Sequence, residues 1–566
     1  MKEKRGIILF GAGQIGKNAL RYFGPEKVSY FADNREALAG TSVDGVPVIS
    51  FARLKEIHGE YQIVLSMDVG AALVVSAQLE DAGISGYDTF FRILNGGAED
   101  TPVKPGSRTP AVVRGSRSED GKQVLMIAYQ FPPLSGSGVF RSIKFAKYLP
   151  AFGWQPTVIS TDRPRPGWNY SDESMVEEIP ETVTVIRIPD TLNASYGTKL
   201  PDRQHELISL LREIMGQDRE ALSLISEWER TNSGRAELMA FPCACLAWAY
   251  DVIRYIEETL DIGLFQAVYT TSDPYSAHLV GACLKRRYGL AWVADYRDPW
   301  TADPGQTFDY TRPRDRLLLS LENTLLHLAD KSIAVEAHLA ADYVNRFHVP
   351  EEQIAVITNG YDEADYTRFP EGMKRPDKFT VNYSGILHVG QSLDAVLLAL
   401  RQLWDEGKLE IAHVRLRVVG EARQYDPRQI AENYGLGSIM EQTGYLSFRE
   451  ALCANRDSSV LLLIPGDSDK MRFVYTGKIF DYLRCGRPIL AISPADGVVD
   501  RLLQETGHGQ AFSSTQIPEI KAMILEEYRK WLSGEPQPPL HSPLIEQFER
   551  KRLTGQLAEI LDEVER

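Results

Sequence analysis

Residues 123–160, QVLMIAYQFPPLSGSGVFRSIKFAKYLPAFGWQPTVIS, contain an apolar strand, a loop rich in glycine and serine, an amphipathic helix and a second strand in direct succession. The helical part places its apolar residues at the spacing of a helix that packs on a sheet. These residues are Phe140, Ile143, Phe145 and Leu149. Strands that alternate with such helices form parallel sheets covered on both faces. The stretch therefore predicts one βαβ unit of a doubly wound α/β domain.

The same order of elements starts twice more in the chain. GIILFGAG at residues 6–13 opens a first unit, and FTVNYSGILHVGQSLDAVLLAL at residues 379–400 opens a third. We therefore expect an α/β protein with three Rossmann-like units in series. A long, mostly helical insertion at about 163–263 interrupts the second unit, and the sequence does not indicate its role. The expected segments are a first unit at 1–95, a flexible linker at 96–122, a second unit at 123–375, a third unit at 376–535 and a terminal helix at 536–566.

The expected linker is rich in Gly, Pro, Ser and charged residues and shows no periodicity, as is typical of flexible linkers. The second and third units have no comparable linker between them. Ligands of doubly wound sheets bind outside the carboxyl ends of the strands, where loops and helix N-termini gather. We therefore expect the working site in a cleft between the second and third units.

The composition of the 566 residues excludes several classes of protein. The net charge of −15 argues against a general nucleic-acid binder, which needs clustered Lys and Arg. The five cysteines form no plausible disulfide framework. No stretch approaches the roughly 20 apolar residues of a membrane span, and the apolar run at the start is too short for a signal peptide. These features favour a cytoplasmic location.

The strongest chemical signal lies at residues 472–490, RFVYTGKIFDYLRCGRPIL. Thr476 and Gly477 precede a helix, and the N-terminus of a helix attracts phosphate through its unpaired N–H groups and partial positive charge. Lys478 in the first turn is unfavourable for the helix dipole, which suggests another use for its charge. Asp481, one turn further on, could accept hydrogen bonds from ribose hydroxyls. A capped core helix with a solvated Lys and Asp would show the same spacing.

Four stretches of the chain, taken in order, resemble the retaining GT-B glycosyltransferases of family 4, also called group 1. The resemblance covers roughly Val124 to the C-terminus. It implies a two-domain enzyme, formed by the second and third units, that moves a hexosyl group from a nucleoside diphosphate sugar to a glycan or lipid-linked acceptor with retention of configuration. It implies no required cofactor and no metal. The stretches are 124–160, TTSDPYSAHLVGACLKRRYGLAWVADYRDPW at 270–300, LADKSIAVEAHLAADYVNRFHVPEEQIAVITNGYD at 328–362 and YTGKIFDYLRCGRPILAI at 475–492.

The resemblance also implies roles for particular residues. In the resembling enzymes the helix that begins near Thr476 binds the donor diphosphate, and the acid at the position of Asp481 holds the ribose. Lys478 would stabilise the departing diphosphate. On the opposite wall Asp298 is the first candidate for a catalytic polar group and His278 the second, although a histidine on a helix often pairs locally. The other residues expected to bind the donor are Gly136, Gly138, Gly385, Gly420, Glu421, Arg472 and Gly477.

One departure from the family pattern concerns the donor sugar. Members often carry Glu-x7-Glu, whose first carboxylate would stand eight positions before Asp481, and this chain has Phe473 there. The sugar hydroxyls would then bind Asp467, Asp469 or a backbone N–H.

A second departure concerns the phosphates. The basic residue that usually follows the glycine at position 385 is missing, and the segment offers only His388. The phosphate charge would then rest on Lys478, with Arg472 or Lys470 as helpers.

The glycine motif at the start of the chain is a separate candidate. Gly11, Gly13 and Gly16 form G-x-G-x-x-G after a strand, and Asp33 ends the next strand near the position of a ribose-binding acid. The segment ends near Leu94 and leaves no room for a catalytic domain of its own. It resembles small Rossmann-like modules of glycan-modifying enzymes, which implies a site for a nucleotide, a nucleotide sugar or NAD(P), or a structural role in assembly.

Three other functions stay open at this point. The chain could be an NAD(P)-dependent sugar oxidoreductase fused to a transferase, a nucleotide-sugar epimerase, or a non-catalytic scaffold that binds a nucleotide sugar in polysaccharide biosynthesis. A lipid-linked acceptor would also bring the protein to the inner face of the membrane as a peripheral protein. The sequence gives no oligomeric state.

Overall fold

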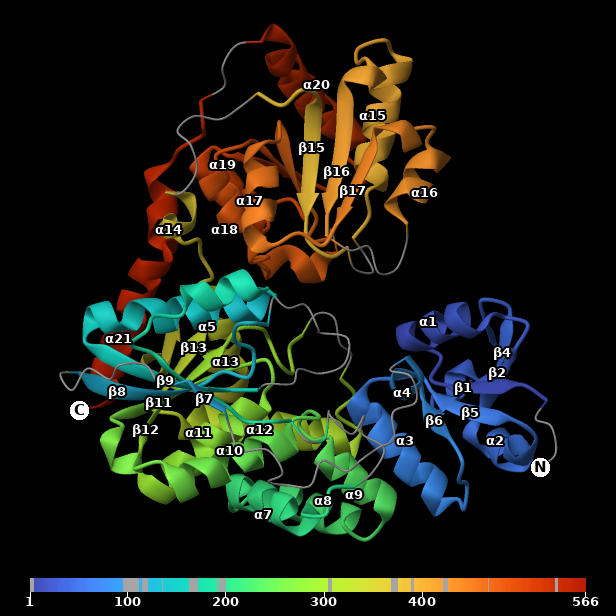
Figure 1. The fold of residues 1–566 in the computed structure, drawn as a ribbon, viewed down its shortest axis with the longest axis vertical. Coiled ribbons are helices and arrows are strands. Elements are labelled where there is room, and N and C mark those ends of the chain that lie inside the picture. The colour runs from blue at the N-terminus through green and yellow to red at the C-terminus, as the bar shows by residue number, and fades with distance from the viewer. Residues whose placement is uncertain are drawn as a thin grey trace.

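The computed structural model contains three sheets, one in each expected unit, and helices cover the faces of each sheet (Figure 1). This arrangement confirms the predicted α/β class with three parallel-dominated sheets. The structure describes residues 5–94, 111–113, 121–134, 136–161, 172–190, 192, 200–303, 308–367, 375–387, 391–420, 426–466, 468–534 and 538–565.

The first unit is a small parallel sheet in the strand order β3-β4-β2-β1-β5-β6, with only β3 antiparallel to its neighbour. The order of its main strands, β4-β2-β1-β5-β6, is that of the first five strands of a Rossmann fold. Its elements are β1 (Ile7–Phe10), α1 (Gln14–Phe23), β2 (Val28–Asp33), β3 (Ser42–Val43), β4 (Val46–Ser50), α2 (Phe51–Ile57), β5 (Gln62–Leu65), α3 (Val69–Asp81), β6 (Asp88–Thr89) and α4 (Phe90–Leu94).

The second unit has an eight-stranded sheet in the order β14-β13-β12-β11-β8-β9-β10-β7. The edge strand β7 lies within the segment expected to be a linker, and it pairs antiparallel with β10. The strands are β7 (Ala111–Val113), β8 (Lys122–Ile127), β9 (Trp154–Ser160), β10 (Thr184–Arg187), β11 (Ala267–Thr271), β12 (Ala291–Tyr296), β13 (Lys331–Ala334) and β14 (Ile354–Val356). The α-helices are α5 (Ser137–Tyr148), α7 (Gln204–Met215), α8 (Arg219–Trp228), α9 (Asn232–Met239), α10 (Leu246–Thr259), α11 (Ser276–Tyr288), α12 (Pro313–Leu328), α13 (Ala337–Phe347) and α14 (Glu363–Tyr366).

The third unit is a fully parallel sheet in the order β17-β16-β15-β18-β19-β20. Its strands are β15 (Phe379–Ser384), β16 (Val414–Val419), β17 (Met440–Gly444), β18 (Val460–Leu463), β19 (Ile489–Ile492) and β20 (Gly509–Phe512). Its helices are α15 (Asp394–Asp405), α16 (Pro427–Asn433), α17 (Phe448–Arg456), α18 (Lys478–Cys485), α19 (Val498–Thr506) and α20 (Ile517–Ser533). The terminal helix α21 (Arg550–Val564) leaves this unit and packs against α5 of the second (Figure 1).

The chain therefore crosses between the second and third units twice, and the two crossings are hydrogen-bonded to each other. The N–H of Tyr361 donates to the carbonyl of Phe548 at 3.1 Å, and the N–H of Arg550 donates to the carbonyl of Tyr361 at 2.8 Å. A Cβ on Gly360 would overlap the Phe548 carbonyl oxygen, so only glycine fits where the two segments meet. This paired crossing fixes the floor of the space between the two units.

The helical insertion of the second unit holds the first unit in place. Helix α3 lies against α9, and its residues Val69, Leu73 and Ala77 belong to the same buried core as helices α7 to α11. The Asp81 carboxylate also accepts a hydrogen bond from the N–H of Ser233 at 2.9 Å. The insertion, whose role the sequence did not indicate, is a docking surface for the first unit.

The described helices are at most 17 residues long, and the longest is the charged helix α20. Within the described residues, none combines the length and the apolar character that crossing a membrane requires.

Leu73→Ala in the full chain should reduce the free energy of unfolding by about 2–4 kcal/mol, because Leu73 is fully buried where α3 meets the second unit. Denaturant unfolding followed by circular dichroism measures the loss. Leu532→Ala, at a side chain 48% exposed, is the matched control and should change little. Equal effects of the two substitutions would contradict the docking of α3 in this core.

Candidate functional site

A cavity of about 570 Å³ lies between the second and third units. Loops that follow strands of both parallel sheets form its walls, which is where ligands of such sheets bind. The residues that line it include Gly136, Asp298 and Glu336 of the second unit, Gly385, Gly420, Thr476, Gly477, Lys478 and Asp481 of the third unit, and Arg550 of the terminal helix.

The ammonium group of Lys478 is held at one end of this cavity. Its Nζ donates to the hydroxyl of Tyr383 at 3.1 Å and lies 4.4 Å from the centre of the same ring. A Cβ on Gly385 would overlap this Nζ, and Gly385 has φ 130°, so glycine alone fits above the ammonium. No carboxylate forms an ion pair with Lys478 in the described part of the chain, and burial lowers its pKa to about 8. The group therefore remains a cation at neutral pH, with no anionic partner among the residues that the structure describes.

The N-terminus of helix α18 opens into the same cavity. A Cβ on Gly477 would meet nothing within 4 Å, so a ligand can approach the backbone there. Thr476 Oγ1 is buried without a hydrogen-bond partner among the described residues. The helix dipole, the free hydroxyl and the Lys478 ammonium together favour an anion at this point.

Two charged groups from different elements border the far side of the α18 tip. Asp481 accepts a hydrogen bond from the hydroxyl of Tyr366 at 3.2 Å, and burial raises its pKa to about 7, although the positive charge of Arg550 opposes this shift. Arg550 is buried, with its Nη1 unpartnered within the described residues. Burial and the nearby Arg141 guanidinium lower its pKa to about 10. Arg550 is thus a second cation on the cavity wall with unused donor capacity.

The opposite wall carries Asp298 beside Arg297, just after strand β12. The Asp298 side chain is reached by solvent from the cavity, while the surrounding protein raises its pKa and Arg297 opposes the shift. Arg297 donates through Nε to the carbonyl of Ser272, and its guanidinium fills the space that a Cβ on Gly138 would need. Gly138 therefore packs against the Arg297 side chain and does not line the cavity, whereas Gly136 does.

Glu336 is an acid of the cavity that the sequence did not single out. It follows strand β13 and is only 6% exposed. The backbone N–H of Tyr475 faces its carboxylate and opposes the rise in its pKa, and its Oε2 has no partner in the described part of the chain. Burial raises the pKa of Glu336 to about 7.

Most of the residues expected from the sequence meet in the cavity. The donor-side candidates Gly385, Gly420, Thr476, Gly477, Lys478 and Asp481 share its walls with Gly136 and Asp298. Three of the residues expected from the sequence lie outside the described residues, namely His388, Glu421 and Asp467.

Besides Gly138, which packs against Arg297 and is not on the wall, two expected site residues lie elsewhere. His278 is fully buried, its Nδ1 lies 2.8 Å from Thr270 Oγ1, and burial lowers its pKa to about 3, so the imidazole is a neutral core group away from the cavity wall. Arg472 bonds to Asp469 at 3.0 Å and to the carbonyl of Ala495 at 2.9 Å, outside the wall. The sequence could not reveal either outcome, because both depend on tertiary packing.

The glycine motif of the first unit has a different local structure. The Asp33 carboxylate accepts hydrogen bonds from the N–H of Ala12 at 2.9 Å and from the N–H, Nε and Nη2 of Arg35 at 2.8 to 2.9 Å. Burial works to raise the pKa of Asp33, yet these bonds hold it below its usual value. Four bonds use the acceptor positions that a ribose would need. A Cβ on Gly16 would overlap the Gly11 carbonyl, so the motif packs its helix closely on the sheet.

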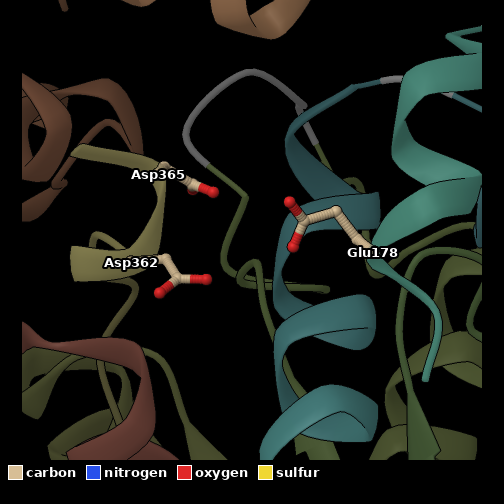
Figure 2. A group of neighbouring side chains, drawn as sticks. All are labelled: Glu178, Asp362 and Asp365. Carbon is tan, nitrogen blue, oxygen red and sulfur yellow. The ribbon is translucent and has the colours of Figure 1, made fainter. Parts of the chain in front are cut away.

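Three carboxylates face one another beside the crossing between the units. Figure 2 shows Asp362 and Asp365 near helix α14 and Glu178 on the opposing segment. Lys144 Nζ lies 2.7 Å from Asp362, 3.0 Å from Asp365 and 3.1 Å from Glu178. A lysine thus already supplies the cation that these acids share, and the cluster joins α5 to the crossing segment.

Comparison with known proteins places a family match inside the second unit. Residues 197–365 match Glycosyltransferase Family 4. A search of curated proteins returned no match. The family match supports a glycosyltransferase-type enzyme, built here on an α/β fold.

Solved structures of glycosyltransferases are similar to about three quarters of the chain at low identity. A glycosyltransferase from Rickettsia africae ESF-5 is 11% identical, with a TM-score of 0.48 over 78% of this chain and 98% of that one. Sucrose-phosphate synthase from Thermosynechococcus elongatus is 14% identical, with a TM-score of 0.45 over 78% of this chain and 99% of that one. HepE from Anabaena, solved in complex with UDP-glucose, is 14% identical, with a TM-score of 0.47 over 78% of this chain and 99% of that one.

Gly385→Ala should lower the free energy of unfolding by about 1–3 kcal/mol, because the new Cβ would displace the Lys478 ammonium and strain a left-handed backbone. Gly477→Ala is the matched control on the same wall, since its Cβ meets nothing and its φ is −54°. Thermal unfolding compares the two variants. A tolerated Gly385→Ala would show that Lys478 is not held beneath this glycine.

Proposed function

We propose that this chain transfers a sugar from a nucleoside diphosphate sugar, bound in the cavity between the second and third units, to a hydroxyl group of a glycan or lipid-linked acceptor. The observation that carries the proposal is the uncompensated Lys478 ammonium at the open N-terminus of α18. A diphosphate supplies an anionic partner that the described residues do not give Lys478.

The proposed reaction develops negative charge on the diphosphate, next to the positive end of the site. The bond between the sugar C1 and the diphosphate oxygen breaks, and C1 gains positive character while the diphosphate gains negative charge. Lys478 and the helix tip stabilise that charge most in the transition state, which lowers the barrier. The acceptor oxygen then bonds to C1, and its proton passes to the departing diphosphate oxygen, so the configuration at C1 is retained.

The two walls take different parts in this proposal. Asp298 faces the cavity from the second unit and orients the acceptor hydroxyl, while Asp481 holds the ribose of the donor. Arg550 adds a second positive charge near the nucleotide, in place of the basic residue that the segment after Gly385 lacks. His278 has no part, since it lies in the core.

The proposed transfer takes no cofactor from the first unit. The acceptor positions of Asp33 are used by Arg35 and Ala12, which favours a structural role of the glycine motif over a nicotinamide site. The docking of α3 on the insertion supports the same interpretation.

Lys478→Met should reduce turnover of the best donor by about two orders of magnitude, the usual effect of removing one group that stabilises a developing anion. Release of nucleoside diphosphate from UDP-glucose, GDP-mannose or ADP-glucose, with glycan and lipid-linked acceptors offered in turn, measures it. Lys408→Met, at an exposed lysine of the same unit, is the control and should keep full activity. Near-normal turnover by a folded Lys478→Met protein would remove the proposed mechanism.

Affinity for the free nucleoside diphosphate should fall as the pH rises through about 8. Burial lowers the pKa of Lys478 to that value, so above it the free protein loses the ammonium charge, whereas the phosphates are ionised throughout, with a last pKa near 6. Calorimetry between pH 7 and 9.5 should show a decline approaching tenfold per pH unit above 8 in the wild type. Lys478→Met should lack this step. Parallel curves for the two proteins would assign the pH dependence to another group.

A further inference from the structure

Glu336 belongs to a different part of the chain from the α18 tip, yet it faces the same cavity. It stands at the position before helix α13, where Ser, Thr, Asp or Asn usually caps the helix, but its side chain makes no capping bond. The carboxylate instead meets the N–H of Tyr475, across the space between the units. Its side chain is therefore directed away from its own helix and toward the third unit.

The segment that approaches Glu336 is the one that departs from the family pattern. Phe473 occupies the position of the expected sugar-binding acid, and its ring stacks on His338 at 4.0 Å with an interplanar angle of 10°. His338 is two residues after Glu336 in the same unit. Phe473, where the third unit lacks the carboxylate, thus contacts the same segment of the second unit that carries Glu336.

The substitutes suggested by the sequence do not reach this place. Asp469 is 88% exposed on its side chain and pairs with Arg472, away from the cavity wall. Asp467 lies outside the described residues. Among the described residues, Glu336 and Asp298 are the acids of the second unit that line the cavity, and of these only Glu336 is nine-tenths buried.

The position of Glu336 relative to the helix tip fits a sugar. Tyr475, whose N–H meets the carboxylate, is two residues before Gly477. An extended chain advances at most about 3.6 Å per residue, so these two backbone positions lie within about 7 Å of each other. A sugar attached to a diphosphate at the α18 tip would come within reach of the carboxylate.

We propose that Glu336 binds hydroxyl groups of the donor sugar, replacing from the second unit the carboxylate that the third unit lacks at Phe473. This inference rests on the proposed function. The Glu336 carboxylate, which lines the cavity with its Oε2 unpartnered within the described residues, accepts the hydroxyl hydrogen bonds. Because the acid comes from the opposite unit, a donor sugar bridges both units, whereas a free nucleoside diphosphate contacts mainly the third.

The test compares affinities for a sugar nucleotide and for its free nucleoside diphosphate. The probes are UDP-glucose with UDP, GDP-mannose with GDP and ADP-glucose with ADP, and the pair that binds the wild type most tightly is used. The ratio of the two dissociation constants isolates the contribution of the sugar. Glu336→Gln should reduce the contribution of the sugar to affinity, measured as this ratio, by about tenfold or more, because a charged acceptor is lost. The affinity for the free diphosphate should change by less than about twofold. Glu351→Gln, at an exposed acid of the same unit, should leave both constants unchanged.

A deoxygenated donor gives a second readout that a structural role would not produce. Removing the hydroxyl that Glu336 binds should weaken binding to the wild type and have almost no effect on Glu336→Gln, since the two changes remove the same contact. If Glu336→Gln fails to fold, Glu336→Asp, which keeps the charge on a shorter side chain, undergoes both comparisons and should show a smaller loss in the same direction.

The outcomes separate this inference from the function on which it rests. An unchanged ratio in the folded variant, or an equal loss for sugar nucleotide and free diphosphate, overturns the role of Glu336 and leaves the proposed function standing. The second result would assign Glu336 to holding the two units together. If the wild type binds none of the nucleoside diphosphates, the proposed function fails and the inference fails with it.

Discussion

The ammonium group of Lys478 lies against the ring of Tyr383, beneath Gly385, with no carboxylate paired to it in the described structure. Burying an unpaired cation is unfavourable, and the lowered pKa of this lysine expresses that cost. A fold keeps such an arrangement when a ligand completes it. The rest of the cavity is consistent with an anionic ligand, since the helix tip, the Thr476 hydroxyl and the Arg550 guanidinium all border the same space.

The architecture explains how these groups come together from distant parts of the sequence. Two parallel sheets direct the loops after their strands toward a common space. The paired chain crossings at Gly360 and Phe548 fix how the two units meet, and the cluster around Lys144 fastens α5 to one crossing. The first unit is docked on the outer helices of the second through α3. The charged and polar groups that could bind an anion thus lie in the cavity, whereas the acid of the glycine motif, Asp33, is already bonded to Ala12 and Arg35.

Local sequence patterns predicted the parts of the site that depend on backbone geometry. Gly477 and Lys478 could be recognised because a glycine turn and a helix start follow one another there, whereas Gly385 was expected only from the resemblance to a known family. The same patterns could not place His278, since a helix position does not say whether a side chain meets a cavity or a core. They also missed Glu336 and Arg550. The only sequence signal for Glu336 is an acid at an unusual capping position after a strand, and Arg550 resembles any polar residue of an amphipathic terminal helix.

A crystal structure of the full chain with the nucleoside diphosphate that it binds most tightly would test the central claim directly. We expect density for the diphosphate at the N-terminus of α18, within hydrogen-bonding distance of Thr476 and Lys478 Nζ. Density at the Gly11–Gly16 loop of the first unit, with the cavity between the second and third units unchanged, would contradict it.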